Sequence, residues 1–424
     1  MSYPHSETTT SPDSAVVRKK HHAGRFIVPR TALTPTPFDA NQNTPVVFVA
    51  SGGGPYANTR AALAGVDLSP AAGRRVLLKP NAGRVVAIGA GVTTHPEVLA
   101  AAIDAFREAG ADVAVGESPI TGVKTLDAFA QCGIKAVADE RNCPLLDMDE
   151  RASIPVRIPG GVAIDQLKVC PEALEFDVVV SVPVMKTHMH TGVTLSVKNM
   201  KGCLWRRSKV ELHMLPKNLD IDEKPLDIAI ADMASVLLPH LAIIDGTIGM
   251  EGLGPSAGTP KGLDTVVVGV DPFAADATAC ALMGIAACDI PHLRMGAERG
   301  LGIIDMERIR VLPENWRDAR QAFALPPTNL SLEFPNVAIF DAQSCSACQA
   351  SLLLFLRRHG EQLFGGKGDA EKTPIAIGKG HESVPPGTLC VGNCTAKHRK
   401  ENPFVPGCPP VASEILNVYN EYFK

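Results

Sequence analysis

The sequence predicts an α/β protein with mainly parallel sheets, flanking helices and a second, smaller α/β domain at its C-terminal end. Short runs of β-branched and aliphatic residues alternate with helical patterns, which favours parallel strands joined by helices. A Pro-rich stretch interrupts this alternation, and a compact pattern restarts after it. The length of 424 residues also exceeds what one ordinary hydrophobic core accommodates.

The first part of the chain opens with four predicted strands. These buried strands are Val46–Ala50, Arg75–Lys79, Asp112–Gly116 and Val178–Val182. A helix is predicted over 95–108, with Thr94 as its N-cap, Pro96 in its first turn and Gly110 just beyond its end. Strand–helix–strand order of this kind predicts a mainly parallel sheet.

The alternation continues to about residue 283. Helical spacing over 227–238 precedes strands at 241–245 and 265–270, and Asp271 introduces a helix over 272–283. The stretch 317–331 is rich in Pro and polar residues, so it is the best linker candidate in the chain.

A second α/β pattern follows this linker. Its predicted elements are a strand at 336–340, a helix at 346–359, strands at 374–377 and 388–391, and a closing helix at 410–422. We therefore predict a disordered leader (1–30), a large α/β domain (31–323) and a smaller, flavodoxin-like α/β domain (324–424).

Composition and charge exclude several classes of protein. The formal net charge is −4 and no basic excess is clustered, so we expect no nucleic-acid partner. No apolar run reaches the length of a membrane span, and the polar leader lacks the apolar core of a secretory signal, so we expect no membrane partner. Eleven cysteines without such a signal indicate a cytoplasmic protein whose clustered thiols bind metal or do chemistry.

Five cysteines crowd the last eighty residues: Cys345, Cys348, Cys390, Cys394 and Cys408. They lie where predicted strands end, and such ends lie along one edge of a parallel sheet. Thiolates from converging loops, two of them from a C-x-x-C pair, suit a four-iron cluster. Gly392 and Gly407 let backbone N–H groups approach its sulfides.

Three other interpretations fit the same residues. Tetrahedral zinc also uses C-x-x-C with two later cysteines, but structural zinc usually joins short knuckles, not an intact α/β unit. A thioredoxin-type redox pair leaves the later cysteines unexplained. The thiols are otherwise plain buried side chains. The spacing favours iron–sulfur over zinc.

The C-terminal pattern resembles the proximal-cluster domain of nickel–iron hydrogenase small subunits and of the small subunit of respiratory quinone oxidoreductases. The C-x-x-C before an apolar helix, the Gly-x-Cys turn and Gly407-Cys408-Pro409-Pro410 carry the resemblance over about 90 residues. It implies that Cys345, Cys348, Cys394 and Cys408 hold a [4Fe–4S] cluster. Those families have glycines where this chain has residues 395–398, so Cys390 remains a substitute for the third ligand.

The first part resembles a family known as domain of unknown function 362. The residues that carry the resemblance are Lys79-Pro80-Asn81, Thr94-His95-Pro96-Glu97, Gly116-Glu117-Ser118, Lys186-Thr187-His188, the run 195–202, Asp245-Gly246 and Asp271-Pro272. The match runs from about residue 75 to 283. It implies a shared fold and a shared site, without a settled chemistry.

Polar residues follow successive predicted strands of this part, as in the active site for a small anion. We assign catalytic roles to Lys186, His188 and Lys79, and substrate binding to Asn81, Lys198, Lys201 and Asp245. His188 titrates near neutrality and is a candidate for proton transfer. The glycine-rich run 249–254 is a weak candidate for a phosphate-binding loop. A mobile lid over the site explains it at least as well.

The leading functional hypothesis is an iron–sulfur oxidoreductase, whose [4Fe–4S] cluster exchanges electrons with a small anionic substrate or cofactor bound at the large domain. The alternatives are a non-redox lyase or hydratase with an open iron site, and an electron-relay or cluster-assembly partner without enzymatic activity. No nicotinamide fingerprint is present in the sequence. A flavin as second cofactor, a ferredoxin as electron donor and assembly into a homo-oligomer stay open.

Overall fold

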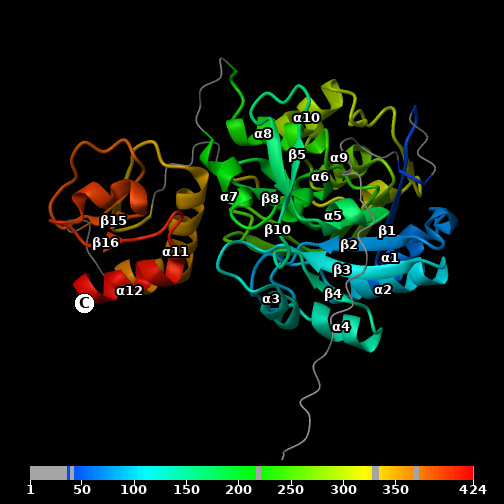
Figure 1. Ribbon diagram of the computed structural model, residues 1–424, viewed down its shortest axis with the longest axis horizontal. Helices are drawn as coiled ribbons and strands as arrows, with labels where there is room; N and C mark the ends of the chain where they lie inside the picture. Colours follow the sequence, from blue (N-terminus) through cyan, green and yellow to red (C-terminus); the bar gives the residue numbers. More distant parts are fainter. Residues whose placement is uncertain (1–35, 39–42, 216–220, 327–333, 366–371, 424) are drawn as a thin grey trace, which may run out of the picture.

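The computed structural model describes residues 36–38, 43–215, 221–326, 334–365 and 372–423. The predicted leader, 1–30, lies outside them. A large α/β body precedes a small one along the chain, and helix α11 (Ser346–Phe364) of the small body faces the large one (Figure 1). In the described part of the chain, no helix combines the length and apolar character needed to cross a membrane.

Ten strands form the large sheet in the described residues. Its main path runs β12 (Arg310–Leu312), β1 (Val46–Ser51), β11 (Thr259–Gly269), β10 (Leu241–Glu251), β7 (Val178–Val182), β2 (Arg75–Pro80), β3 (Asp112–Glu117) and β4 (Leu145–Asp147). From β10 to β4 all neighbours are parallel, whereas β11 is antiparallel to both β10 and β1. Off this path, β8 (Val184–His188) pairs with β10 and with β9 (Gly192–Thr194).

Helices cover both faces of this sheet. They are α1 (Gly54–Leu63), α2 (Pro96–Glu108), α3 (Thr125–Gln131), α4 (Ile134–Glu140), α5 (Glu172–Glu175), α6 (Ser196–Asn199), α7 (Ser208–Glu211), α8 (Pro225–Ala234), α9 (Pro272–Leu282) and α10 (Pro291–Glu298). Short 3₁₀ turns are η1 (Ser69–Ala71), η2 (Met200–Cys203), η3 (Leu212–Met214), η4 (Ala287–Asp289) and η5 (Trp316–Ala319), and β5 (Ile154–Arg157) pairs with β6 (Gln166–Val169).

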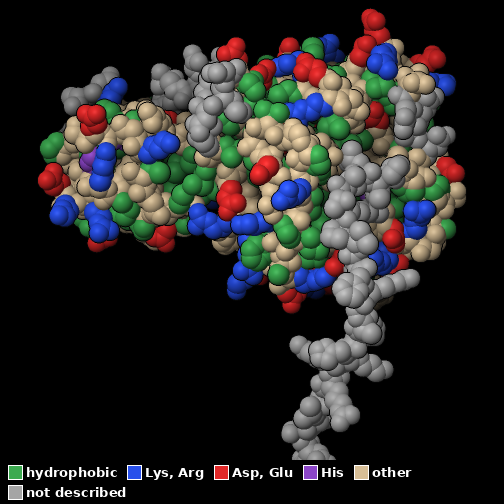
Figure 2. Space-filling view, turned by 45° about the horizontal axis from the view of Figure 1, so that its top comes forward, with side chains coloured by type: hydrophobic (Ala, Val, Ile, Leu, Met, Phe, Trp, Pro, Cys, Tyr) green, Lys and Arg blue, Asp and Glu red, His purple; other side chains and the backbone are tan. Residues whose placement is uncertain are grey.

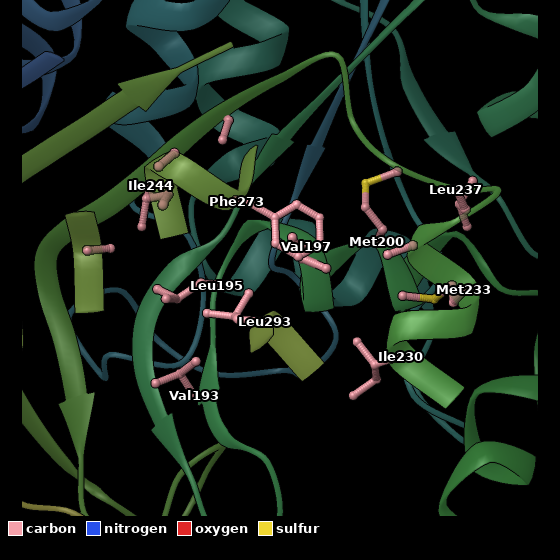
Figure 3. Close-up of a cluster of buried hydrophobic side chains, with 14 of the residues drawn as sticks. Val193, Leu195, Val197, Met200, Ile230, Met233, Leu237, Ile244, Phe273 and Leu293 are labelled. Carbon is pink, nitrogen blue, oxygen red and sulfur yellow. The ribbon is translucent and has the colours of Figure 1, made fainter. Parts of the chain in front are cut away.

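Two hydrophobic cores result, one on each face. Along β2, Leu77 packs into one core while Val76 and Leu78 pack into the other, as alternation along a strand requires. Figure 3 shows part of the first core, where Phe273 of α9 lies among Leu195, Val197 and Leu293. Because cores pack against both faces, the ends of the strands are held in position relative to one another.

The small sheet is wholly parallel and follows chain order: β13 (Val337–Asp341), β14 (Thr373–Ile377), β15 (Leu389–Val391) and β16 (Phe404–Val405). Helices α11 and α12 (Ala412–Phe423) and the 3₁₀ helix η6 (Asn393–His398) complete it. Phe355, Phe364 and Tyr419 anchor its core, with the last two rings edge to face at 5.1 Å. The predicted fold class is thus confirmed, although the strand order lacks the reversal of a flavodoxin.

Two local expectations were wrong. The N-cap of α2 is His95, whose Nδ1 accepts from the Glu97 amide at 3.3 Å. The hydroxyl of Thr94 instead donates to the Val182 carbonyl at 2.6 Å, which ties α2 to β7. The helix predicted over 346–359 continues to Phe364, and Gly360 lies inside it with the Phe334 ring against its small surface.

The glycine-rich run 249–254 is not a free lid. Strand β10 extends to Glu251, and Met250 pairs with Lys186 of β8. The Thr187 hydroxyl donates to the Gly252 carbonyl at 3.0 Å, and a Cβ on Gly254 would stand 1.9 Å from the Thr187 carbonyl oxygen. Backbone contacts therefore hold this hairpin against the site.

The predicted linker begins as part of the large body. Phe323 is buried, and its amide donates to the Met283 carbonyl at 2.9 Å. The amide of Ala324 donates to the Glu251 carboxylate at the same distance. Residues 327–331 of the predicted linker lie outside the described residues.

Candidate active site

The carboxyl ends of β2, β3, β8 and β10 bring most of the predicted site residues to one region. Lys79 and Asn81 lie at the end of β2, and Lys186 and His188 lie on β8. Lys198 and Lys201 come from α6 and η2, which follow β9 directly. Ligand sites of parallel sheets gather at such ends.

Lys79 forms a buried ion pair with Glu117 of β3, at 2.8 Å. Its ammonium group also donates to the Pro80 carbonyl at 2.7 Å and to the Asn199 amide oxygen at 3.1 Å, so all three of its donors are used. The Glu117 carboxylate in turn accepts from the amides of Ala82 and Ser118. This geometry gives Lys79 a positioning role between β2, β3 and α6.

Lys186 is buried, and it forms no ion pair with a carboxylate of the described residues. Its ammonium group donates to the Asn81 side-chain oxygen and, at 2.8 Å, to the Val92 carbonyl. Burial lowers its pKa well below the usual lysine value, and the nearby cations Lys198, Arg84 and Lys79 lower it further. Asn81 is thereby placed beside Lys186, as a shared role in substrate binding requires.

Lys198 and Lys201 repeat this pattern. Lys198 donates to the Thr194 hydroxyl at 3.0 Å, and burial lowers its pKa to about 7. Lys201 contacts the imidazole of His213, and its pKa is held well below the usual value by burial and by Lys198 and Lys209. Among the described residues, no carboxylate forms an ion pair with Lys186, Lys198 or Lys201.

Three histidines lie next to these lysines. The rings of His188 and His190 are 5.8 Å apart, and those of His190 and His213 are 6.4 Å apart. The Nδ1 atom of His188 accepts from the His190 amide at 3.1 Å. Burial and the surrounding lysines lower all three imidazole pKa values, that of His190 to about 4. The rings are therefore neutral at physiological pH.

Asp245, a predicted substrate ligand, is occupied by the protein. One of its carboxylate oxygens accepts from the His95 amide at 2.7 Å and the other from the Thr247 amide at 2.9 Å. Burial raises its pKa even though these bonds oppose the shift. It ties the start of α2 to β10.

The result is a buried cluster of basic side chains that give up their protons more readily than ordinary lysines. Lys186, Lys198 and Lys201 form no ion pair among the described residues, although Glu117 and Asp227 act electrostatically on Lys186 and Lys198. The half-buried Arg84 lies close enough to lower the pKa of Lys186 further. Burial, together with Arg358 of α11, lowers the pKa of Arg84 to about 10. Buried cations are costly unless they are paired, so a bound anion is the natural complement of this cluster.

The cysteines form a second site at the carboxyl edge of the small sheet. Cys345 precedes α11 and Cys348 lies in its first turn. The Cys348 thiol and the amides of Cys348 and Ala347 stabilise the Cys345 thiolate and lower its pKa to about 6. The pKa of Cys348 is raised, first by that contact and then by burial.

Cys394 and Cys408 complete this group. Both act electrostatically on Cys348, and Cys345 and Cys408 raise the pKa of Cys394 after burial. Cys390 differs: it is fully buried within β15, and burial alone raises its pKa to about 11. Of the two candidates for the third position, the fold thus places Cys394, and not Cys390, beside the other three.

Within the described residues, no three His, Cys, Asp or Glu side chains converge tightly enough for a single metal ion. A mononuclear zinc site needs its ligands about 2.3 Å from one centre. A four-iron cluster is larger, and its thiolates stand further apart. The absence of a tight three-residue group therefore bears on a single metal ion and not on a larger cluster.

The two sites are joined by Ser346, which lies between the paired cysteines. Its hydroxyl bonds to Nδ1 of His213 at 2.7 Å and its carbonyl to Nε2 of His190 at 3.0 Å. Arg207 donates to the Cys408 carbonyl at 3.0 Å, and the Met214 sulfur lies 3.9 Å from the Cys408 sulfur. The cation cluster and the cysteines are therefore neighbours.

Sequence reasoning missed several members of this junction, namely His213, Arg84, Lys209, Ser346 and Arg358. Ser346 stands inside the C-x-x-C pair but had no predicted role, and the other four belong to none of the motifs described above. His213 is also distant from β8 in the sequence. The available signal was the basic character of residues 198–213, which contain five Lys or Arg residues and end at His213. A separate cavity of about 300 Å³, lined by Met306, Ile309, Val311, Glu314, Trp316 and Arg317, contains none of the predicted residues.

Comparisons with known proteins agree with the resemblance of the first part. The family described as Domain of unknown function (DUF362) matches residues 76–281. A thylakoid-associated protein of Synechocystis sp. is 30% identical over 239 residues, which cover 54% of this chain and 69% of that protein. The family match ends before the C-terminal cysteines that begin at Cys345, so the hydrogenase-like resemblance of the small body stays a prediction.

Two solved structures are similar at low identity. The lactate racemase apoprotein from Thermoanaerobacterium thermosaccharolyticum has 13% identity and a TM-score of 0.38, with 61% of this chain and 60% of that chain covered. A protein from Thermotoga maritima has 15% identity and a TM-score of 0.31, with 49% and 54% covered. The chain thus spans less than two thirds of either.

Proposed function

The chain belongs to the DUF362 family, and we propose that this member is an iron–sulfur oxidoreductase acting on a small anion. The observation that carries the proposal is the cluster of buried lysines, without ion pairs among the described residues, that lies against the cysteine loops. In this proposal Cys345, Cys348, Cys394 and Cys408 hold a [4Fe–4S] cluster, and Lys186, Lys198 and Lys201 bind the anion.

The cysteine residues fit such a cluster. They come from three loops at one sheet edge, and four thiolates are the ligands that a four-iron cluster requires. The backbone also approaches closely: a Cβ on Gly392 would lie 3.4 Å from the Cys348 sulfur. When bound, the cluster would supply one-electron transfer.

The lysines and histidines account for substrate binding. Lys186 and Lys198 would present ammonium groups to the anion, and their protonated forms would be favoured once it binds. Asn81 orients Lys186 through their side-chain contact. The neutral imidazoles of His188, His190 and His213 are able to accept or donate a proton beside the bound anion. A flavin remains compatible as the anionic group, since its phosphate has the required charge.

Metal analysis of the full chain, purified without oxygen, tests the cysteine site. We expect about four irons and four sulfides per chain and an EPR signal after reduction. Cys408→Ala should lose the iron while the large body stays folded. Cys390→Ala is the matched control and should keep it, because Cys390 lies within β15.

The opposite results are equally informative. Full iron content in Cys408→Ala would contradict the assignment of Cys408 as a cluster ligand. Zinc in place of iron would contradict the proposed redox function. A cluster that readily loses and regains one iron would favour the lyase or hydratase alternative, since that iron would then lack a protein thiolate and would have an open coordination position. A reducible cluster in a protein that binds no anion would favour the electron-relay alternative.

A further inference from the structure

The cysteine edge of the small body opens to the surface at Cys394. This thiol is exposed, whereas Cys348 is buried. Cys394 and Lys397 are three residues apart in η6, and side chains with that spacing lie above one another on a 3₁₀ helix. Lys379, which follows β14, acts on the same thiol electrostatically. We call Lys379, Lys397, Arg399 and Lys400, all exposed, the basic rim.

The basic rim differs in sign from the chain as a whole. The formal net charge of the chain is −4, yet between residues 379 and 401 the exposed carboxylates are those of Glu382 and Glu401, against the four cations of the rim. Figure 2 shows Lys and Arg side chains on the small body at the left of the view. A local positive field of this kind attracts and orients an acidic protein.

Apolar side chains lie beside the same cysteines. Met214 and Val411 are 41% and 48% exposed, and the Met214 sulfur is 3.9 Å from that of Cys408. Val411 follows Cys408 in the chain by three residues. An apolar centre with a charged rim is the usual anatomy of a protein interface, and electron-transfer encounters use the smallest of these.

We propose that the basic rim docks a small acidic one-electron carrier protein of the ferredoxin type, which reduces the cluster at its Cys394 side. This inference rests on the proposed function, because it requires a cluster at these cysteines. In each encounter the reduced carrier loses one electron and the oxidised cluster gains it. No covalent bond forms or breaks, and the carrier leaves in its oxidised state.

Stopped-flow reduction of the anaerobically purified full chain by reduced plant-type [2Fe–2S] ferredoxin tests this proposal. The variants are Lys397→Glu and Lys400→Glu, with Lys372→Glu as control. Lys372 is exposed and precedes β14, so it lies at the opposite edge of the small sheet. Each substitution takes the formal net charge from −4 to −6, which matches the variants in overall charge.

We expect the two rim variants to lower the second-order rate about tenfold at low salt, and the difference from the control to vanish at about 1 M salt. Reduction by the methyl viologen radical cation should not slow in any variant. Equal ferredoxin rates in all three variants would overturn the docking site while leaving the cluster in place. Absence of iron in the unsubstituted chain, measured beforehand, would overturn the proposed function and this inference together.

Discussion

Lys79 and Lys186 are both buried lysines of the same site, yet their surroundings give them different roles. Lys79 faces the Glu117 carboxylate, and every donor of its ammonium group is used. Lys186 faces an amide oxygen and a carbonyl, with further cations behind it. The first arrangement keeps the ammonium group charged and joins β2 to β3, whereas the second favours the neutral amine unless an anion binds beside it.

This difference predicts opposite costs for two matched substitutions. Lys79→Met should lower the free energy of unfolding by about 3–5 kcal/mol, because it leaves the buried Glu117 carboxylate without its counter-charge. Lys186→Met should cost less, since it removes an unpaired charge. Urea denaturation followed by circular dichroism measures both. Equal losses would contradict the assigned roles.

At the scale of the elements, the surroundings of two glycines show how closely the segments of the site are packed. A Cβ on Gly202, in η2, would lie 2.4 Å from both the Lys79 ammonium nitrogen and the Glu117 carboxylate. Gly262 of β11 is a contrast, because a Cβ at that position would lie 3.9 Å from its nearest neighbour, the Thr247 carbonyl oxygen. Only the first glycine is required by its surroundings.

Gly202→Ala should therefore destabilise the protein by about 1–3 kcal/mol through overpacking and should disturb the Lys79–Glu117 ion pair. Gly262→Ala is the control and should change the free energy of unfolding by less than about 0.5 kcal/mol. Thermal unfolding of both variants measures the difference. A tolerant Gly202→Ala variant would show that η2 moves freely away from β2 and β3.

The elements also show what the sequence was able to predict. Strands β2, β3 and β7 were predicted nearly to the residue, because each is a short aliphatic run with clear ends. The extension of β10 and its pairing with β8 were missed, since glycines at 246, 249 and 252 look like a loop. Pairing between distant segments has no local signal, so the hairpin was interpreted as a loop that serves as a weak phosphate cradle or a mobile lid.

The site residues likewise divide into those that the sequence predicted and those that only the structure shows. Lys186, Lys198 and Asn81 were placed together because they follow strands of one sheet. His213 contacts Lys201, which is near in the sequence, and Ser346, which is 133 residues away. The second contact is evident only in the packed structure. Arg84 and Arg358 belong to different bodies, so composition and spacing did not connect them.

At the scale of the whole molecule, the large and small bodies share one electrostatic site. Lys198 is charged in the unfolded chain up to a pKa of about 10.4, but only up to about 7 in the folded protein. Between these values the unfolded chain binds the extra proton, so the stability of the ligand-free protein rises with pH. Below pH 7 the full penalty of burying this charge is present.

A bound anion should reverse this dependence. Inorganic phosphate should raise the melting temperature more at pH 6 than at pH 9, because the lysines take up protons as it binds. Calorimetric titration in buffers with different ionisation heats measures the proton uptake directly. Lys198→Met should bind phosphate at least tenfold more weakly and remove much of the pH dependence. Equal affinity at both pH values would contradict an anion site built on Lys198.

The depressed pKa of Lys198 has a consequence for its chemical reactivity. An ordinary lysine is unprotonated in about one molecule per thousand at pH 7.4, whereas an amine with a pKa of about 7 is unprotonated in more than half. The free amine is the form that acylating reagents attack. Brief treatment with such a reagent near neutral pH, followed by peptide mass spectrometry, should therefore modify Lys198 out of proportion to its small exposed area, and a bound anion should protect it.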